Sequence, residues 1–180
     1  MKIKYIHGNG FEPIGDEHKV IAHSCNDCGG WGRGLVLEIS KRWPQDRAIK
    51  SPEWCYREWH ERGSRFNSKP FVLGQIDKVL VEDNTHVCNM IAQRDYRTLE
   101  ENGIDLKLPN VNYSSLYECL TRLRVSLKVI IPTSINMPRI GAGLGKGNWS
   151  KIETIINQAL GFTPFPVYVY DLEKVPGTIY

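Results

Sequence analysis

The sequence predicts a single α/β domain in which helices cover both faces of a mixed central sheet. Three observations lead to this fold class. Strand-like segments alternate with helical ones, two strand-like runs in mid-chain are adjacent, and the order strand, glycine-rich loop, helix occurs twice. Alternating strands and helices form largely parallel sheets, and adjacent runs add an antiparallel pair. With 180 residues, the chain is long enough for one domain, residues 1–180, with its own core.

Strands are recognised by apolar runs and by alternation of apolar and polar residues. Residues 2–6 alternate charged and apolar side chains, as in an edge or half-buried strand. The two runs in the middle of the chain are joined by a short polar turn, which predicts an antiparallel hairpin or meander. The expected strands are residues 2–6, 19–25, 71–81, 85–93, 137–140 and 166–172.

Two helices are predicted in the first half of the chain. The first follows Gly34 and is stopped by Pro44, because proline cannot continue a helix. Ser51 and Pro52 are typical of an N-cap and the first helical position, and Gly63 is expected to end this second helix.

Two further helices are predicted in the second half. Residues 113–127 carry leucines at spacings of three and four. Asn148 is expected to cap a helix over residues 149–161, whose apolar side chains share one face. The polar region 94–112 is expected to be a loop or short helix that flanks a pocket, and residues 173–180 a short tail.

The segment at residues 23–35, HSCNDCGGWGRGL, joins a strand end, a glycine-rich loop and a helix start. Such a loop lets the backbone approach a ligand closely and presents helix N–H groups to an anion. Two interpretations are open: a phosphate or diphosphate site, or a flexible turn. The spacing matches neither GxGxxG nor GxxxxGK[ST]. His23 and Asn26 flank the strand end, where an open α/β sheet binds its ligand.

A second segment repeats this arrangement at residues 135–149, INMPRIGAGLGKGNW. Its glycines, at positions 141, 143, 145 and 147, follow an expected strand and precede an expected helix. Loops that follow parallel strands lie at the same, carboxyl edge of a sheet. Together the two loops are predicted to hold an extended ligand with a diphosphate at its centre.

Composition restricts the function classes. The net charge of +3, from 23 basic and 20 acidic residues, fits a small anionic ligand and falls short of a nucleic-acid-binding footprint. No apolar stretch approaches 18 residues and the N-terminus lacks the apolar core of a signal peptide, so we expect a cytoplasmic protein without a membrane segment. We expect a monomer.

Five cysteines, at positions 25, 28, 55, 88 and 119, form an odd number at irregular spacing, which argues against a secreted disulfide framework. Cys25 and Cys28 form a CxxC pair, but the other three are single, whereas a structural zinc site needs a second pair of ligands. We therefore expect buried or incidental thiols, with no metal and no cofactor.

These motifs resemble those of the macrodomain family, which binds ADP-ribose and its derivatives. The segment AHSCNDCGGWGRGLVLEISKRWP (22–44) resembles the fungal-type ADP-ribose 1″-phosphate phosphatases, and YIHGNG (5–10) resembles their first strand end. MPRIGAGL (137–144), the following Trp149 and the Val169–Tyr170 pair are similar to later motifs of the family. The resemblance implies a three-layer α/β/α sandwich and covers nearly the whole chain, although residues 45–112 carry no matching motif.

The resemblance also implies roles for individual residues. Asn9 would lie near the adenine and Tyr170 against its face, and the two loops would hold the diphosphate through backbone N–H groups. Asparagine can replace the aspartate that many macrodomains have at the Asn9 position, because its side-chain oxygen also accepts a hydrogen bond. The ligand-binding residues implied are Asn9, Gly10, Gly30, Trp31, Gly32, Arg33, Gly34, Leu35, Ile140, Gly141, Ala142, Gly143, Leu144 and Tyr170.

Two residues are implied in catalysis. Asn26 would bind the distal ribose, and His23 beside it would act as acid, base or water-positioning group, since an imidazole titrates near neutral pH. The alternative for His23 is a structural histidine at a strand end that hydrogen-bonds a neighbouring backbone carbonyl.

The implied activity is hydrolysis of the terminal phosphate of ADP-ribose 1″-phosphate. Two other functions stay open: a module that binds ADP-ribose without turnover, and a hydrolase of ADP-ribose linked to protein or nucleic acid. The deacylating branch of the family uses a lysine and an aspartate. The corresponding positions here resemble Gln93 or Arg94 and Gly145, so chemistry through a lysyl adduct is not expected.

Overall fold

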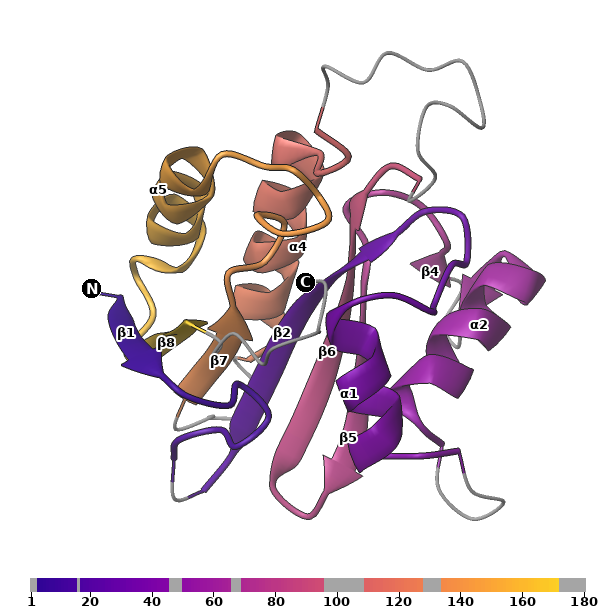
Figure 1. Cartoon of the computed structure of the whole chain (residues 1–180), viewed down its shortest axis with the longest axis horizontal. Helices are drawn as coiled ribbons and strands as arrows, with labels where there is room; N and C mark the ends of the chain where they lie inside the picture. Colours follow the sequence, from indigo (N-terminus) through magenta and orange to yellow (C-terminus); the bar gives the residue numbers. More distant parts are fainter. Residues whose placement is uncertain are drawn as a thin grey trace.

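Six strands form the central sheet of the computed structural model, with helices packed on it (Figure 1). The structure describes residues 3–15, 17–45, 50–65, 69–95, 109–127 and 134–171. The strands are β1 (Lys4–His7), β2 (Lys19–Asn26), β5 (Ile76–Glu82), β6 (Thr85–Gln93), β7 (Ser134–Pro138) and β8 (Val167–Asp171). Their order is β1-β8-β7-β2-β6-β5. All neighbouring pairs are parallel except β5 and β6, which confirms the predicted mixed sheet.

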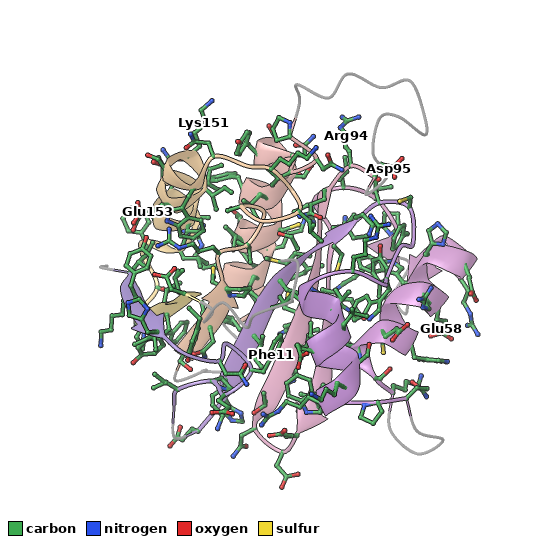
Figure 2. All side chains as sticks on the ribbon, in the orientation of Figure 1. Phe11, Glu58, Arg94, Asp95, Lys151 and Glu153 are labelled. Carbon is green, nitrogen blue, oxygen red and sulfur yellow. The ribbon has the colours of Figure 1, made fainter. Side chains whose placement is uncertain are left out.

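Helices cover both faces of this sheet, as predicted (Figure 1). They are α1 (Leu35–Arg42), α2 (Pro52–Arg62), α4 (Tyr113–Ser126) and α5 (Trp149–Leu160). Successive residues of a strand point to opposite faces, so on β2 Val20 packs in the core under α4 and α5, whereas Ile21 packs in the core under α1 and α2. Figure 2 shows side chains filling both layers.

Side-chain caps fix the ends of three helices. Ser51 accepts a hydrogen bond from the Trp54 N–H at the start of α2, and Gly63 ends that helix in the left-handed conformation, at φ 66°. Asn112 and Asn148 cap α4 and α5 in the same way. The predicted caps Ser51 and Asn148 are therefore confirmed, and the bond satisfies helix N–H groups that would otherwise lack a partner.

Two predicted strands have different bounds in the structure. The strand expected at residues 71–81 begins at Ile76, because Gly74, at φ 87°, turns the chain and donates its N–H to Ile91 O. The strand expected at residues 137–140 is β7, which begins at Ser134 and ends at Pro138. Beyond Pro138, the Ile140 N–H bonds back to Pro138 O at 2.7 Å, so the chain already turns there.

One small sheet in the structure was not expected from the sequence. A two-stranded sheet of β3 (Ser64–Arg65) and β4 (Lys69–Pro70) was not predicted. Most of the polar region 94–112 and the tail at 173–180 lie outside the described residues. Among the helices of the described ranges, none combines the length and the apolar character needed to cross a membrane.

Candidate functional site

Two glycine-rich loops meet at the carboxyl edge of the parallel strands. The first loop, residues 27–34, follows β2, and the second loop, residues 139–148, follows its neighbour β7. A Cβ placed on Gly34 would lie 3.0 Å from Cδ1 of Leu144, so the loops touch at these residues. The structure thus brings together the two segments that the sequence predicted to be neighbours.

The first loop ends at the start of α1, where no side chain caps the N–H groups of the helix. Its N-cap is Gly34, which has no side chain to accept a hydrogen bond and adopts φ 72° and ψ −142°. The Leu37 N–H bonds to Gly34 O, whereas the Leu35 and Val36 N–H groups, as expected in the first turn of a helix, have no acceptor among the residues that the structure describes. A helix N-terminus without a side-chain cap is suited to an anionic ligand.

The second loop is held in shape by its own backbone. The Gly147 N–H donates to Gly141 O at 2.8 Å and the Lys146 N–H to Gly143 O at 2.9 Å. Gly141, at φ 71°, packs so closely that a Cβ there would lie 2.8 Å from Val111. Gly143 and Leu144 remain exposed at the tip of the loop.

Backbone strain concentrates at this edge of the sheet. Within the described ranges, the non-glycine residues with positive φ are Asp95, just after β6, and Lys146, in the second loop. Figure 2 shows Asp95 beside Arg94. Such conformations cost about 1–3 kcal/mol each and cluster at functional sites.

His23 is buried beneath the first loop. It is 1% exposed, and its ring packs edge-to-face on Trp31 with centroids 5.6 Å apart. Nε2 lies 2.6 Å from Asn89 Oδ1, and because Asn89 donates its own N–H to Pro52 O, the imidazole must donate in this contact. Burial lowers the pKa of His23 to about 4, so the ring is neutral at pH 7.

This placement agrees with the structural alternative for His23, with a side-chain oxygen as acceptor in place of the expected backbone carbonyl. A direct acid or base role would require the imidazole, 1% exposed here, to become accessible to the ligand.

Burial of a neutral His23 predicts a pH-dependent stability. Between pH 6.5 and 4 the unfolded chain binds a proton at this residue that the folded chain does not, so the free energy of unfolding falls as the pH falls. The loss attributable to His23 should reach about 3 kcal/mol near pH 4. Urea unfolding at several pH values checks this by comparing the wild type with His23→Gln, which retains an N–H donor for Asn89. The same slope in both proteins would contradict the assignment.

Asn26 organises the first loop through both ends of its amide. Its Oδ1 accepts the N–H of Gly30 at 2.9 Å and of Cys28 at 3.2 Å, together with the Tyr56 hydroxyl at 2.8 Å. Its Nδ2 donates to Gly30 O at 2.6 Å. This differs from the expected ribose contact, because both ends of the side chain already bind protein groups. Tyr56, on α2, is part of the same arrangement.

Three further predicted residues gather at the ends of β1 and β8. The exposed Asn9 accepts the Phe11 N–H through Oδ1 at 3.0 Å. Gly10 lies against the ring of Tyr170, with 3.5 Å between its Cβ position and the ring. Tyr170 is 2% exposed and its hydroxyl donates to Asn136 at 2.9 Å. The ring is thus covered, so an adenine could stack directly on its face only after the residues that bury it had moved.

The remaining predicted residues differ in exposure. Trp31 is buried, Gly32 and Arg33 are exposed, and Ile140 and Gly141 are buried under the exposed tip of the second loop.

Arg139, which the sequence did not single out, ties the start of the second loop to β8. It pairs with Asp171 through two hydrogen bonds, and its guanidinium lies 4.9 Å from the ring centroid of Trp149 and 5.3 Å from that of Tyr5. In the sequence it lies within the MPRIGAGL motif, at a position that was expected to belong to a strand.

Known proteins resemble the chain over nearly its whole length, although no protein-family model matches it. It is 39% identical to a protein of unknown function from Bacteroides thetaiotaomicron, over 96% of this chain and 99% of that one, with a TM-score of 0.82. It is 36% identical to a macrodomain protein from Streptomyces coelicolor, over 94% and 99% of the two chains, with a TM-score of 0.74. An ADP-ribose 1″-phosphate phosphatase of Lodderomyces elongisporus is 26% identical over 95% of this chain and 100% of its own length.

Proposed function

Since this chain belongs to the macrodomain family, we propose that it binds ADP-ribose and removes the terminal phosphate of ADP-ribose 1″-phosphate. The observation that carries the proposal is the contact between the two glycine loops at Gly34 and Leu144, directly beside the uncapped start of α1. The likeness to a phosphatase along its full length supports the choice of substrate.

The diphosphate would lie between the loops. Backbone N–H groups of Gly32 to Leu35 and of the loop tip, Gly143 and Leu144, would donate to its oxygens. The N–H groups of Ile140 and Ala142, which the resemblance also implied, already bond to Pro138 O and Arg139 O. The partial positive charge of the α1 N-terminus would favour the anion. The exposed side chains of Arg33 and Lys146 add positive charge at the rim. In the reaction, water attacks the phosphorus, the bond from phosphorus to the ribose oxygen breaks, and a proton from the water ends on that oxygen, which gives ADP-ribose and inorganic phosphate. Preorganised N–H donors stabilise the charge on the phosphoryl oxygens.

A second candidate function is binding without turnover. Binding without turnover is supported by the surroundings of the two predicted catalytic residues. The side chains of His23 and Asn26 both form hydrogen bonds to other groups of the protein. The same loops would then recognise free or linked ADP-ribose.

Phosphate release from ADP-ribose 1″-phosphate, with calorimetry of ADP-ribose binding on the same sample, distinguishes the candidates. Saturable release supports the phosphatase. Binding without release supports the second candidate. Neither binding nor release would overturn the proposed site.

Turnover by His23→Gln tests the direct catalytic role. We expect kcat to fall by less than about tenfold, because the buried imidazole is neutral and glutamine keeps a donor for Asn89. A general acid or base contributes about 10²-fold or more. A loss of that size with unchanged ADP-ribose affinity would show that His23 reaches the substrate after all.

A further inference from the structure

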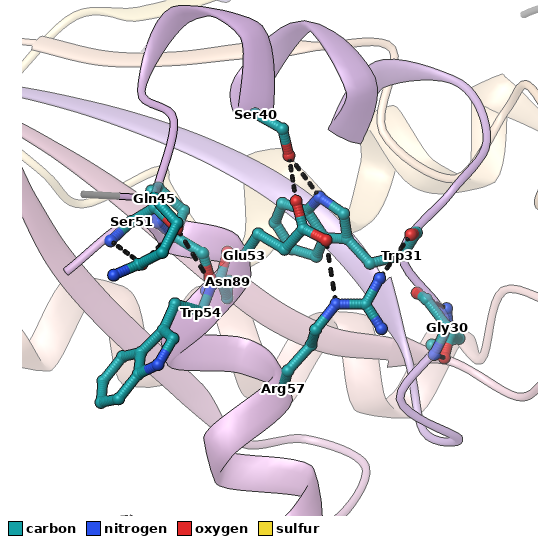
Figure 3. A network of polar contacts seen from close by, with 11 residues as sticks. Gly30, Trp31, Ser40, Gln45, Ser51, Glu53, Trp54, Arg57 and Asn89 are labelled. Carbon is teal, nitrogen blue, oxygen red and sulfur yellow. Dashed lines mark hydrogen bonds and ion pairs between the residues drawn. The ribbon is translucent and has the colours of Figure 1, made fainter. Parts of the chain in front are cut away.

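A closed ring of hydrogen bonds joins Trp31 of the first loop to Ser40, Glu53 and Arg57 (Figure 3). The Trp31 indole N–H donates to Ser40 Oγ at 2.8 Å, and Ser40 donates to Glu53 Oε2 at 2.5 Å. Glu53 Oε1 accepts from Arg57 Nε at 2.9 Å, and Arg57 Nη2 donates back to the backbone oxygen of Trp31 at 2.9 Å. The ring therefore joins the first loop, α1 and α2.

Donor and acceptor roles in this ring are fixed. The indole can only donate and the carboxylate can only accept, so the Ser40 hydroxyl must accept from one and donate to the other. Arg57 is the group that closes the ring, since its planar fork binds the carboxylate and the carbonyl at the same time. Lysine cannot reproduce this geometry from a single nitrogen.

The ring fixes both ends of the segment that is proposed to bind phosphate. Trp31 directly precedes Gly32, and Ser40 lies in the helix that begins at Leu35. The Trp31 ring is held from below by His23 and from the side by Tyr56, whose centroid lies 5.3 Å away. The loop itself is rich in glycine, which constrains the backbone little.

We infer that Glu53 and Arg57, on α2, are positioning residues for the N–H groups of Gly32 to Leu35. They act through Trp31: Glu53 through the indole N–H by way of Ser40, and Arg57 through the backbone oxygen. The consequence for affinity rests on the proposed function, whereas the consequence for loop order does not.

Hydrogen exchange without ligand tests the inference first. In Arg57→Met, amide exchange in peptides covering residues 27–36 should rise at least about tenfold, equivalent to ~1.4 kcal/mol of opening free energy. The matched control is Arg62→Met. Arg62 forms the equivalent i,i+4 pair with Glu58 on the same helix, at 3.0 Å. Equal exchange in the two variants would overturn the inference.

A double-mutant cycle in ADP-ribose binding then separates positioning from general stability. Glu53→Gln should weaken binding about tenfold in the wild type and clearly less in Trp31→Phe, which lacks the indole N–H, because only the bond from Glu53 to Arg57 is left to lose there. Arg57→Met should weaken binding in both backgrounds, because it holds a backbone oxygen, and Arg57→Lys should not restore it. Additive effects of Glu53→Gln and Trp31→Phe would overturn the route through Ser40.

The two proposals fail separately. If the wild type does not bind ADP-ribose, the proposed function fails, while the exchange experiment still decides whether Glu53 and Arg57 order the loop.

Discussion

Gly34→Val is expected to weaken ADP-ribose binding at least about 100-fold. Gly34 adopts φ 72° and ψ −142°, a region that is essentially restricted to glycine and costs other residues about 1–3 kcal/mol. A Cβ would also lie 3.0 Å from Cδ1 of the exposed Leu144 side chain, so a branched residue must displace that side chain as well as turn the backbone. The change of backbone moves the N–H groups at the start of α1, and displacements of about 1 Å at a positioned site cost on the order of 10²-fold. Calorimetry of ADP-ribose binding measures the effect.

Gly63→Val is the matched control. Gly63 also has positive φ, at 66°, but its Cβ position has no atom within 4 Å and it lies at the end of α2. The substitution should cost about 1–2 kcal/mol of stability from the left-handed backbone alone and leave binding unchanged. Equal binding by Gly34→Val and Gly63→Val would show that the start of α1 does not contact the ligand.

Asn26→Ala should lower the free energy of unfolding by about 4 kcal/mol and abolish ADP-ribose binding. The substitution removes the acceptor of two backbone N–H groups and the donor to Gly30 O, whereas the Tyr56 hydroxyl keeps the Asn26 backbone oxygen as a partner at 2.7 Å. Each buried group left without a partner costs about 1–3 kcal/mol, reduced where water can enter the loop. Chemical denaturation and calorimetry measure the two effects.

Two further variants identify the cause. Asn112→Ala removes a single capping bond to Ser115 and should cost only about 1 kcal/mol. Asn26→Asp keeps the acceptors, loses the donor and places a charge beside Gly30 O, so its cost should be intermediate. If Asn26→Ala were as mild as Asn112→Ala, the first loop would not depend on this amide.

Local signals allowed much of the fold to be predicted. Helix ends were predictable because caps act within a few residues: Ser51 and Asn148 bond to N–H groups three positions away. The strand of residues 71–81 was predicted too long, because its start is decided by a bond from Gly74 to Ile91, which belongs to another strand. No pattern within residues 71–81 indicates the bond from Gly74 to Ile91.

The sequence by itself determined that the two glycine loops would lie at the same edge of the sheet. Each preceding strand could be predicted from its own residues, and loops that follow parallel strands share the carboxyl edge. Only the tertiary structure decided which groups surround His23 and Asn26. Their partners, Asn89 and Tyr56, lie 66 and 30 positions away in the chain. Trp31 packs against the imidazole, and burial lowers the pKa of His23 to about 4. Residue type and spacing can place a side chain at a strand end, but its exposure and pKa depend on which distant elements pack around it.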